Sequence, residues 1–520
     1  MPAKVRDDRY GRCAMATASS TTAAPVALLR ALPRRVGRAL PATATIVGVA
    51  ALLRVLYEPA FLNYDARYSL MWARDLGRGF VPDYLTAFAP TPHPFQTAFS
   101  FLVLPFGAGA DQVILTLALL SFGALAWLVY RLGAEIHSPW VGTTAAIVVV
   151  TRPALERYAL IGYQDLAFAA LIVWCVLVET RSPRRGLPVL AALALAGLMR
   201  PDAWVLSGLY VLYLWPVSAP RRRAALTAVA LAAPLLWAAQ DWLVTGDPLH
   251  SLHGTSGVAE QKGRTNDILR APYQAAWYFK LLLLAPLHLV VPVGLVFAWR
   301  HARRAGVLVA AATAITAVIV LQTVLGLPLI TRYLATPSVL LTVIFALAVF
   351  GWLRLPRGRA RLGWAAVGGA SLGVTLGFLP GHAGNVKTID TYVALSTKVY
   401  GDLRLVGQDP AVRERFAACG QTLSTIGHRP VPDLRYWLDA PPGSIRVVEG
   451  QVRRVGPLVL VPRNAPQVWR YYRERFSQVK LPAGYRPLYV NDSWSVLTAP
   501  GCGSGMLPVA PGGAGLQQES

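Results

Sequence analysis

Long apolar stretches recur along the 520-residue chain, separated by short segments that carry arginine, proline and glycine. A helix needs about 20 apolar residues to cross the ~30 Å hydrocarbon core of a bilayer. The pattern predicts spans at 39–57, 111–131, 139–151, 164–180, 187–199, 203–216, 224–244, 275–299, 306–330, 333–353 and 362–380. The apolar run 94–107 is too short to span and is interpreted as re-entrant or interfacial. We therefore expect an all-α polytopic membrane protein with about 11 transmembrane helices.

Short basic runs lie between several of these predicted spans, such as "RSPRRG" from Arg181, "PRRR" ending at Arg223 and "RHARR" from Arg300. Basic short loops face the cytoplasm in most membrane proteins. This rule predicts a multi-pass plasma-membrane protein with a cytoplasmic N-terminus. The segments expected on the outer face are then 58–110, 152–163, 200–202 and 245–272, together with everything after about residue 381.

The two ends of the chain differ in composition from the predicted transmembrane domain, residues 39–380. Residues 1–38 are rich in Ala, Ser, Thr and Arg, which predicts a disordered cytoplasmic tail. In residues 381–505, alternating stretches such as "SIRVVEG", "GPLVLVPR" and "YRPLYV" predict strands, and "NVKTIDTYVALSTKVYGDLRLV" and "PQVWRYYRERF" predict helices. We expect a small extracytoplasmic α/β C-terminal domain there, followed by a disordered Gly/Pro-rich tail at 506–520.

The composition agrees with a membrane protein: 54% of residues are hydrophobic, 15% are charged, and the mean hydropathy is +0.44. The net charge of +24 does not predict a nucleic-acid partner, because the basic residues cluster in the short loops. The sequence contains no nucleotide-phosphate loop, HExxH, GxSxG or cysteine zinc motif. ATP-driven transport and the common hydrolase mechanisms therefore lack support.

The first outer segment contains the stretch "FLNYDARYSLMWARDLGRGFVPDY", which places several charges among aromatic residues. Large apolar residues recur in it at helical spacing: Tyr68, Met71, Trp72 and Leu76. This spacing predicts an interfacial amphipathic helix over 65–80, whose aromatic rings and arginines lie at headgroup level. An anchoring helix does not account for Asp65, since a carboxylate near anionic lipid has no evident structural use. Asp65 is therefore the candidate catalytic residue.

Two further outer segments carry ionisable residues beside apolar runs. Asp165 begins a predicted span, where a carboxylate could also serve only as a helix cap. Arg200 and Asp202 flank a proline in "GLMRPDAW", where the alternative is a tight turn with a local ion pair. Ionisable residues at membrane depth are candidates for function.

The remaining candidates for substrate binding are Arg67, Asp83, His93, Arg332 and Tyr333. His93 lies between prolines in "TPHPF", and a lone histidine is more often structural than a ligand. Carboxylates and arginines from separate loops on one side of the membrane could hold a lipid-linked phosphate beside a base for a hydroxyl group. We expect Arg67, Arg200 and Arg332 to contact the phosphate. Asp83, His93 and Asp165 would position the acceptor or a metal ion.

These motifs, in this order, resemble the GT-C superfamily of integral-membrane glycosyltransferases, which includes protein O-mannosyltransferases and aminoarabinose–lipid A transferases. The similarity covers roughly residues 40–380. It rests on "YDARYSLMWARDLGRGFVPDY", "TPHPF", Asp165, "LMRPDAW" and "RYL". Asp65 occupies the acidic position that follows the first span in that family. Ala66 replaces the second acid of the family pattern.

The resemblance implies an inverting transfer of a sugar from a polyprenyl-phosphate donor to a hydroxyl of an envelope glycan, glycolipid or protein, on the outer face. It also implies a divalent cation (Mg²⁺ or Mn²⁺) in some members, and the alanine at position 66 leaves metal dependence open. The alternatives are a transporter or flippase of lipid-linked sugars and a non-catalytic scaffold with this fold. A transporter is expected to show internal repeats and polar groups near the bilayer midplane, and the sequence shows neither.

Cys419 and Cys502 both lie in the predicted extracytoplasmic domain, where the compartment is oxidising. We expect a disulfide between them, which would tie the last strand to a helix; the alternative is two free thiols. Cys13 and Cys175 have no neighbours at metal-ligand spacing and are expected to be inert.

Overall fold

The computed structural model describes residues 23–57, 61–264, 268–448, 454–463, 468, 484–502 and 507–508. The chain divides into two compact units, Met1–Ala44 and Thr45–Ser520. The first helix, α1 (Ala23–Leu56), begins within the predicted N-terminal tail, and the disorder of that tail stays a prediction. Residues 1–22 of this tail, and the predicted 506–520 tail apart from Leu507 and Pro508, lie outside the described residues.

The remaining helices before the C-terminal part follow in chain order. They are α2 (Tyr64–Gly77), α3 (Pro94–Val103), α4 (Ala110–Ile136), α5 (Pro139–Val150), α6 (Pro153–Leu160), α7 (Asp165–Arg181), α8 (Leu187–Gly197), α9 (Asp202–Leu214), α10 (Pro220–Thr245), α11 (His250–Gln261), α12 (Ala271–Leu283), α13 (Leu287–His301), α14 (Gly306–Leu321), α15 (Ala335–Phe350) and α16 (Arg359–Gly377). Short 3₁₀ turns join some of them: η1 (Leu104–Gly109), η2 (Trp215–Val217), η3 (Arg303–Ala305), η4 (Gln322–Leu325), η5 (Thr331–Leu334) and η6 (Gly351–Arg354).

Every predicted span coincides with helix, but the predicted count of 11 spans is not confirmed. Within the described residues, five helices are long and apolar enough to cross a membrane, or up to seven if each of two bent pairs is one span. The predicted span 275–299 is one of these pairs, because α12 and α13 meet at 101°. The helices nevertheless describe a multi-pass membrane protein. The predicted short element 94–107 is α3 with part of η1, which turns at Gly107 (φ 55°) before α4 begins.

The core of the helical part is α15, which is buried along almost its whole length and packs against α5, α7, α13 and α14. Small residues allow this packing. A Cβ at Gly294 of α13 would lie 2.0 Å from the carbonyl oxygen of Ile344 in α15. A Cβ at Gly142 of α5 would lie 2.2 Å from that of Tyr130 in α4. Such close approach is typical of helices that associate in a membrane, where dispersion contacts replace the hydrophobic effect.

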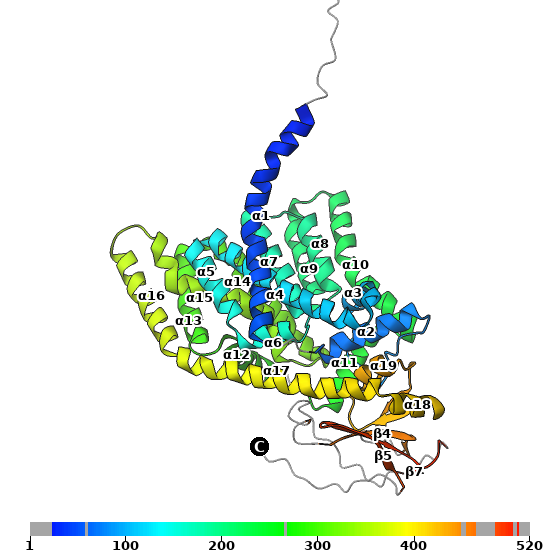
Figure 1. Ribbon diagram of the computed structural model, residues 1–520. Helices are drawn as coiled ribbons and strands as arrows, with labels where there is room; N and C mark the ends of the chain where they lie inside the picture. Colours follow the sequence, from blue (N-terminus) through cyan, green and yellow to red (C-terminus); the bar gives the residue numbers. More distant parts are fainter. Residues whose placement is uncertain are drawn as a thin grey trace, which may run out of the picture. The chain divides into compact units, whose positions relative to one another are not determined.

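The C-terminal part begins with the long helix α17 (Leu379–Gln408), drawn in yellow in Figure 1, and continues with α18 (Pro410–Ala418) and α19 (Val431–Leu438). A five-stranded sheet has the order β2 (Ile445–Val447), β1 (Leu423–Thr425), β4 (Leu458–Pro462), β6 (Trp494–Thr498) and β5 (Arg486–Val490). β1 is parallel to β2 and β4, while β6 is antiparallel to β4 and β5. β3 (Arg454–Val455) and β7 (Leu507–Pro508) form a second, two-stranded sheet.

The predicted strands correspond to β2, β4 and β5, and the first predicted helix corresponds to α17. The second predicted helix, 466–476, lies outside the described residues except for residue 468. The helix and the last strand that the predicted disulfide would join correspond to α18 and β6, whereas β1 and α19 were not predicted. The domain limits at 381 and 505 stay predictions, since residues 45–520 form one compact unit.

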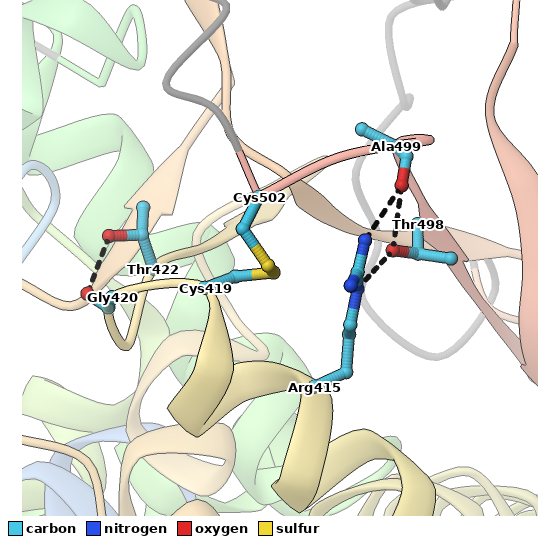
Figure 2. Close-up of a disulfide and its surroundings, with 7 residues drawn as sticks. All are labelled: Arg415, Cys419, Gly420, Thr422, Thr498, Ala499 and Cys502. Atoms are coloured by element: carbon cyan, nitrogen blue, oxygen red, sulfur yellow. Dashed lines mark hydrogen bonds between the residues drawn. A yellow bond between two sulfur atoms is a disulfide. The ribbon is translucent and has the colours of Figure 1, made fainter.

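A disulfide joins Cys419, at the end of α18, to Cys502, which follows β6 (Figure 2). This is the pairing expected from the sequence, and it spans 83 residues. Figure 2 also shows Arg415 of α18 donating from Nε to Thr498 Oγ1 and from Nη2 to the carbonyl oxygen of Ala499, each at 3.0 Å. The disulfide and these hydrogen bonds hold the last strand of the sheet against the helix.

Candidate active site

The start of α2 is fixed by Asn63, which places Asp65 beside the turn between α6 and α7. The Asn63 side chain accepts hydrogen bonds from the backbone N–H groups of Asp65 and Ala66 at 3.0 and 3.1 Å, as a helix N-cap does. Its backbone and side-chain nitrogens both donate to the carbonyl oxygen of Ile161, at 2.8 and 2.9 Å. This residue therefore fixes both the helix start and the position of the carboxylate in its first turn.

Asp65 forms an ion pair with Arg332 of η5, which lies immediately before the central helix α15. Arg332 Nη1 donates to Asp65 Oδ2 at 2.7 Å. The guanidinium also lies over the ring of Tyr163, 4.8 Å from its centroid. The two charged side chains are 19% and 21% exposed. The pair is therefore fixed from one side by protein and still open to a ligand from the other.

A second charged group lies next to this pair. Arg200 donates from Nη1 to Asp165 Oδ1 at 2.5 Å, and from Nε and Nη2 to Asp202 Oδ2 at 2.9 and 2.6 Å. All three side chains are less than a tenth exposed. The Arg200 guanidinium stacks over Tyr333 at 4.3 Å, which links it to the residue that follows Arg332.

The contacts of these two segments include the structural alternatives considered for them and extend beyond them. The local ion pair between Arg200 and Asp202 is present, but it is extended by Asp165 from another helix. Asp165 is the first residue of α7 and not its N-cap, which is Gln164. The structure thus brings together Asp165, Arg200, Asp202, Arg332 and Tyr333, all predicted from the sequence, beside Asp65.

His93 joins the group from the N-terminus of α3. It lies close enough for electrostatic interaction with Asp65, Asp165, Arg200 and Arg332. Its ring makes an edge contact with Trp237 of α10, with centroids 5.6 Å apart. Burial lowers the pKa of His93 to about 4, although the Asp65 carboxylate acts in the opposite direction. The imidazole is therefore neutral near pH 7.

The pKa of Asp65 is below its ordinary value. Burial acts to raise it, but the positive charges of Arg332 and of Arg429, from the turn before α19, outweigh that effect. Asp65 is consequently a carboxylate at neutral pH. Arg429 was not predicted, because it is distant in sequence from every motif and lies in an ordinary-looking "HRP" turn.

A pH titration tests the placement of His93. The unfolded histidine binds a proton below about pH 6.5, whereas the folded one binds it only below about 4. The contribution of His93 to stability should therefore be constant above about pH 6.5 and fall as the pH decreases from there towards 4. We expect a smaller loss in His93→Gln, measured as the thermal midpoint across this pH range. Identical slopes in both proteins would contradict the assignment.

The interpretation of 65–80 as an interfacial helix with snorkelling arginines is wrong. Helix α2 is buried from Ala66 to Asp75, between the other helices and α19. Arg67, predicted as a phosphate ligand, is 3% exposed; its Nε lies 2.8 Å from Asp433 Oδ1 and its Nη2 lies 3.7 Å from Asp111 Oδ2. Burial raises the pKa of Asp433 to about 7, with Asp111 adding to the shift and Arg67 opposing it. Arg67 is thus a contact to α19 and not part of the Asp65 group.

Asp83 is likewise directed to the C-terminal part. Its Oδ2 accepts a hydrogen bond from the backbone N–H of Gly443 at 3.2 Å and lies 3.8 Å from Arg435 Nη1. The structure does not bring Asp83 to Asp65. The charges of this segment dock α2 against α19, a pairing between residues about 360 positions apart that local spacing cannot reveal.

A metal ion does not fit the carboxylates of this site. Asp65 and Asp165 are each paired with an arginine, and position 66 supplies no second acid. No group of three or more His, Cys, Asp or Glu side chains that could hold a metal occurs in the part of the chain that the structure describes. No step below involves a metal.

The sequence and the fold were compared with those of known proteins. No protein-family model matches the sequence, and no curated protein sequence matches it significantly. The fold of this chain has similar solved structures. It is similar to ArnT from Cupriavidus metallidurans bound to undecaprenyl phosphate, with a TM-score of 0.52 and 12% identity, over 91% of this chain and 99% of that one. The structure of ArnT from Cupriavidus metallidurans in the apo state is also similar, with a TM-score of 0.51 and 12% identity, over 88% of this chain and 98% of that one.

An oligosaccharyltransferase from Archaeoglobus fulgidus, also in the apo form, gives a TM-score of 0.49 at 12% identity, over 79% of this chain and 65% of that one. At 12% identity, the similarity to the two ArnT structures shows the fold alone. The activity is argued from the site.

Proposed function

We propose that the protein is a glycosyltransferase that moves a sugar from a polyprenyl-phosphate donor to an acceptor hydroxyl. The observation that carries this proposal is the half-open Asp65–Arg332 pair, a carboxylate and a guanidinium 2.7 Å apart. It occurs in a fold shared with ArnT, which has been crystallised with undecaprenyl phosphate. A base for a hydroxyl and a cation for a phosphate are what such a transfer requires.

In the proposed reaction, the acceptor oxygen attacks the anomeric carbon and its proton passes to Asp65. The bond between that carbon and the phosphate oxygen breaks, and polyprenyl phosphate leaves with the electron pair. Arg332 stabilises the negative charge of the leaving phosphate. Attack from the face opposite the leaving group inverts the anomeric configuration.

Arg332 would exchange partners when the donor binds. Its guanidinium can form charge-assisted hydrogen bonds with the donor phosphate in place of Asp65. Neutralising the Arg332 charge removes the main influence that keeps the pKa of Asp65 low against burial. The carboxylate would become a better base once the donor is in place.

Arg200 contributes less directly in this proposal. It is saturated by Asp165 and Asp202 and is stacked on Tyr333, so it holds the segment that carries Arg332. His93, neutral and partly buried near Asp65, would orient the acceptor without supplying charge. Action on the outer face of the plasma membrane, with the C-terminal part extracytoplasmic, remains part of the proposal and follows from the distribution of basic loops.

Substitution of Arg332 tests the phosphate assignment. Hydrogen bonds to charged groups contribute about 1.5–3 kcal/mol. Arg332→Gln should therefore lower kcat/KM for a polyprenyl-phosphate sugar by about 10- to 100-fold, and Arg332→Lys by less. The measurement is transfer of radiolabelled sugar by purified protein in nanodiscs. Arg300→Gln, an exposed arginine at the end of α13, is the control and should behave as wild type. Unchanged donor use by Arg332→Gln would refute the assignment.

A further inference from the structure

A cavity of about 260 Å³ lies between the segment 84–92 and helix α11. Its walls include Tyr84, Phe88 and Thr91 on one side, and His250, Thr255 and Gln261 on the other. At ~30 Å³ per water molecule, the cavity offers the space of roughly nine waters, enough for a small ring and too little for a folded peptide segment.

The cavity adjoins the Asp65 group through two covalent neighbours of that group. Tyr64, which precedes Asp65, donates its hydroxyl hydrogen to the carbonyl oxygen of Phe88 at 3.0 Å. Pro92 lines the cavity, and His93 follows it directly. The chain thus connects the cavity to the Asp65 group, although Asp65 and His93 themselves do not line it.

Phe88 is held in the cavity wall in a conformation that its side chain disfavours. Its φ is 61°, in the left-handed region where a bulky residue is an outlier. Such strain persists where surrounding contacts impose it, and it is common at ligand sites.

Two contacts from separate parts of the chain hold the Phe88 ring, in addition to the Tyr64 hydrogen bond. His428 of the C-terminal part stacks on it with centroids 4.7 Å apart. Lys262, just after α11, lies 5.1 Å from its centroid, and its Nζ lies 2.9 Å from His428 Nε2. Three segments distant in sequence thus contact Phe88, two of them at its ring and one at its carbonyl oxygen.

The chemistry of the walls is that of a carbohydrate site. Hydroxyl and amide groups of Thr86, Thr91, Ser251, Thr255 and Gln261 alternate with the aromatic rings. No aspartate, glutamate, lysine or arginine is among the lining residues within the described chain. Polar groups without formal charge, set beside aromatic faces, suit a hydroxyl-bearing ring that is itself uncharged.

We propose that this cavity is the acceptor subsite and that it takes an uncharged glycosyl unit, so that the acceptor is a glycan or a glycolipid. This inference rests on the proposed function, since it names the acceptor of that reaction. The sugar ring packs against Phe88 and presents its hydroxyl towards Asp65.

Filling the cavity tests the proposal. Gly257 of α11 lines it, and a Cβ there meets nothing within 4 Å, so Gly257→Leu adds volume without a backbone clash. Gly369→Leu in α16 is the matched control, because a Cβ there also meets nothing and the site is outside the cavity. The probes are methyl α-D-mannopyranoside and methyl β-D-glucopyranoside, with methyl β-D-glucuronide as a charged analogue. Binding is measured by saturation-transfer NMR with protein in nanodiscs.

At least one neutral glycoside should bind to the wild type and to Gly369→Leu with similar affinity. Its affinity for Gly257→Leu should be lower by about tenfold or more, since small steric changes in a pocket have effects of this size. Phe88→Leu should weaken binding as well, and the glucuronide should bind more weakly than its neutral counterpart. The proposal is overturned if no neutral glycoside binds, if Gly257→Leu binds as wild type does, or if the glucuronide binds best.

Repeating the binding measurement with Asp65→Asn separates this inference from the proposed function, because binding does not require the base. Glycoside binding by a wild-type protein that transfers no sugar would refute the function and leave the subsite. Sugar transfer by wild type, without glycoside binding in the cavity, would refute the subsite alone.

Discussion

Replacing Asp65 by asparagine is expected to reduce sugar transfer by roughly 10²- to 10⁴-fold, the usual contribution of a general base. Asparagine has the shape of aspartate and cannot accept the hydroxyl proton. The loss should appear in kcat, because donor binding depends on Arg332, which remains in place. The measurement is the rate at which purified protein transfers radiolabelled sugar from a polyprenyl-phosphate donor.

Two controls accompany this variant. Asp247→Asn changes a solvent-exposed aspartate near α11 and should retain full activity. The thermal midpoint of Asp65→Asn is measured alongside, because the pair is about four-fifths buried and loss of folding must be distinguished from loss of the base. Normal turnover by Asp65→Asn would remove the residue from the mechanism.

The second large effect is expected on stability, at the contact between α2 and α19. Arg435 Nη2 donates to Asp75 Oδ2 at 2.8 Å, and the two side chains are 1% and 2% exposed. Removing one partner of a buried ion pair leaves the other charge without compensation, at a cost of about 3–5 kcal/mol. Arg435→Met should therefore lower the thermal midpoint clearly. Arg435→Met combined with Asp75→Leu should recover much of the loss, since both charges are then gone.

The same contact supplies a matched control. Arg78 Nη2 lies 2.6 Å from Asp439 Oδ1, but these side chains are 42% and 55% exposed. Arg78→Met should cost less than about 1 kcal/mol, as exposed pairs do. Equal effects of Arg78→Met and Arg435→Met on the thermal midpoint would show that burial does not govern this contact.

The helical part was predictable from sequence because apolar runs report burial in lipid or protein directly. The bends between its helices were not predictable. In the sequence, α12 and α13 form one continuous apolar stretch, and the break between them contains Leu284, which adopts a positive φ of 59°. Strands of three residues, such as β1, are too short to show alternation. The length of a helix was thus easier to predict than its direction.

The candidate site was found for a similar reason. Asp165, Arg200 and Arg332 are conspicuous as charges beside apolar runs, and each lies in the group around Asp65. The charges of α2 led to the wrong prediction of an interfacial helix. The sequence of an amphipathic helix has the same pattern whether its polar face contacts lipid headgroups or another part of the protein. Only the fold reveals that Arg67 faces Asp433. The cavity beside Phe88 was equally hidden, since its two walls, the segment 84–92 and helix α11, are distant from each other in the sequence.

The central claim is that this protein breaks the bond between a sugar and a polyprenyl phosphate. The most direct test incubates purified protein in proteoliposomes with polyprenyl phosphates carrying different radiolabelled sugars, together with lipid-extracted acceptor fractions. We predict that one donor loses its sugar to an acceptor, that free polyprenyl phosphate is released in equal amount, and that Asp65→Asn does neither. Movement of the intact labelled lipid across the bilayer would instead identify a transporter. The absence of both transfer and movement with every donor would contradict the account and leave a non-catalytic protein with this fold.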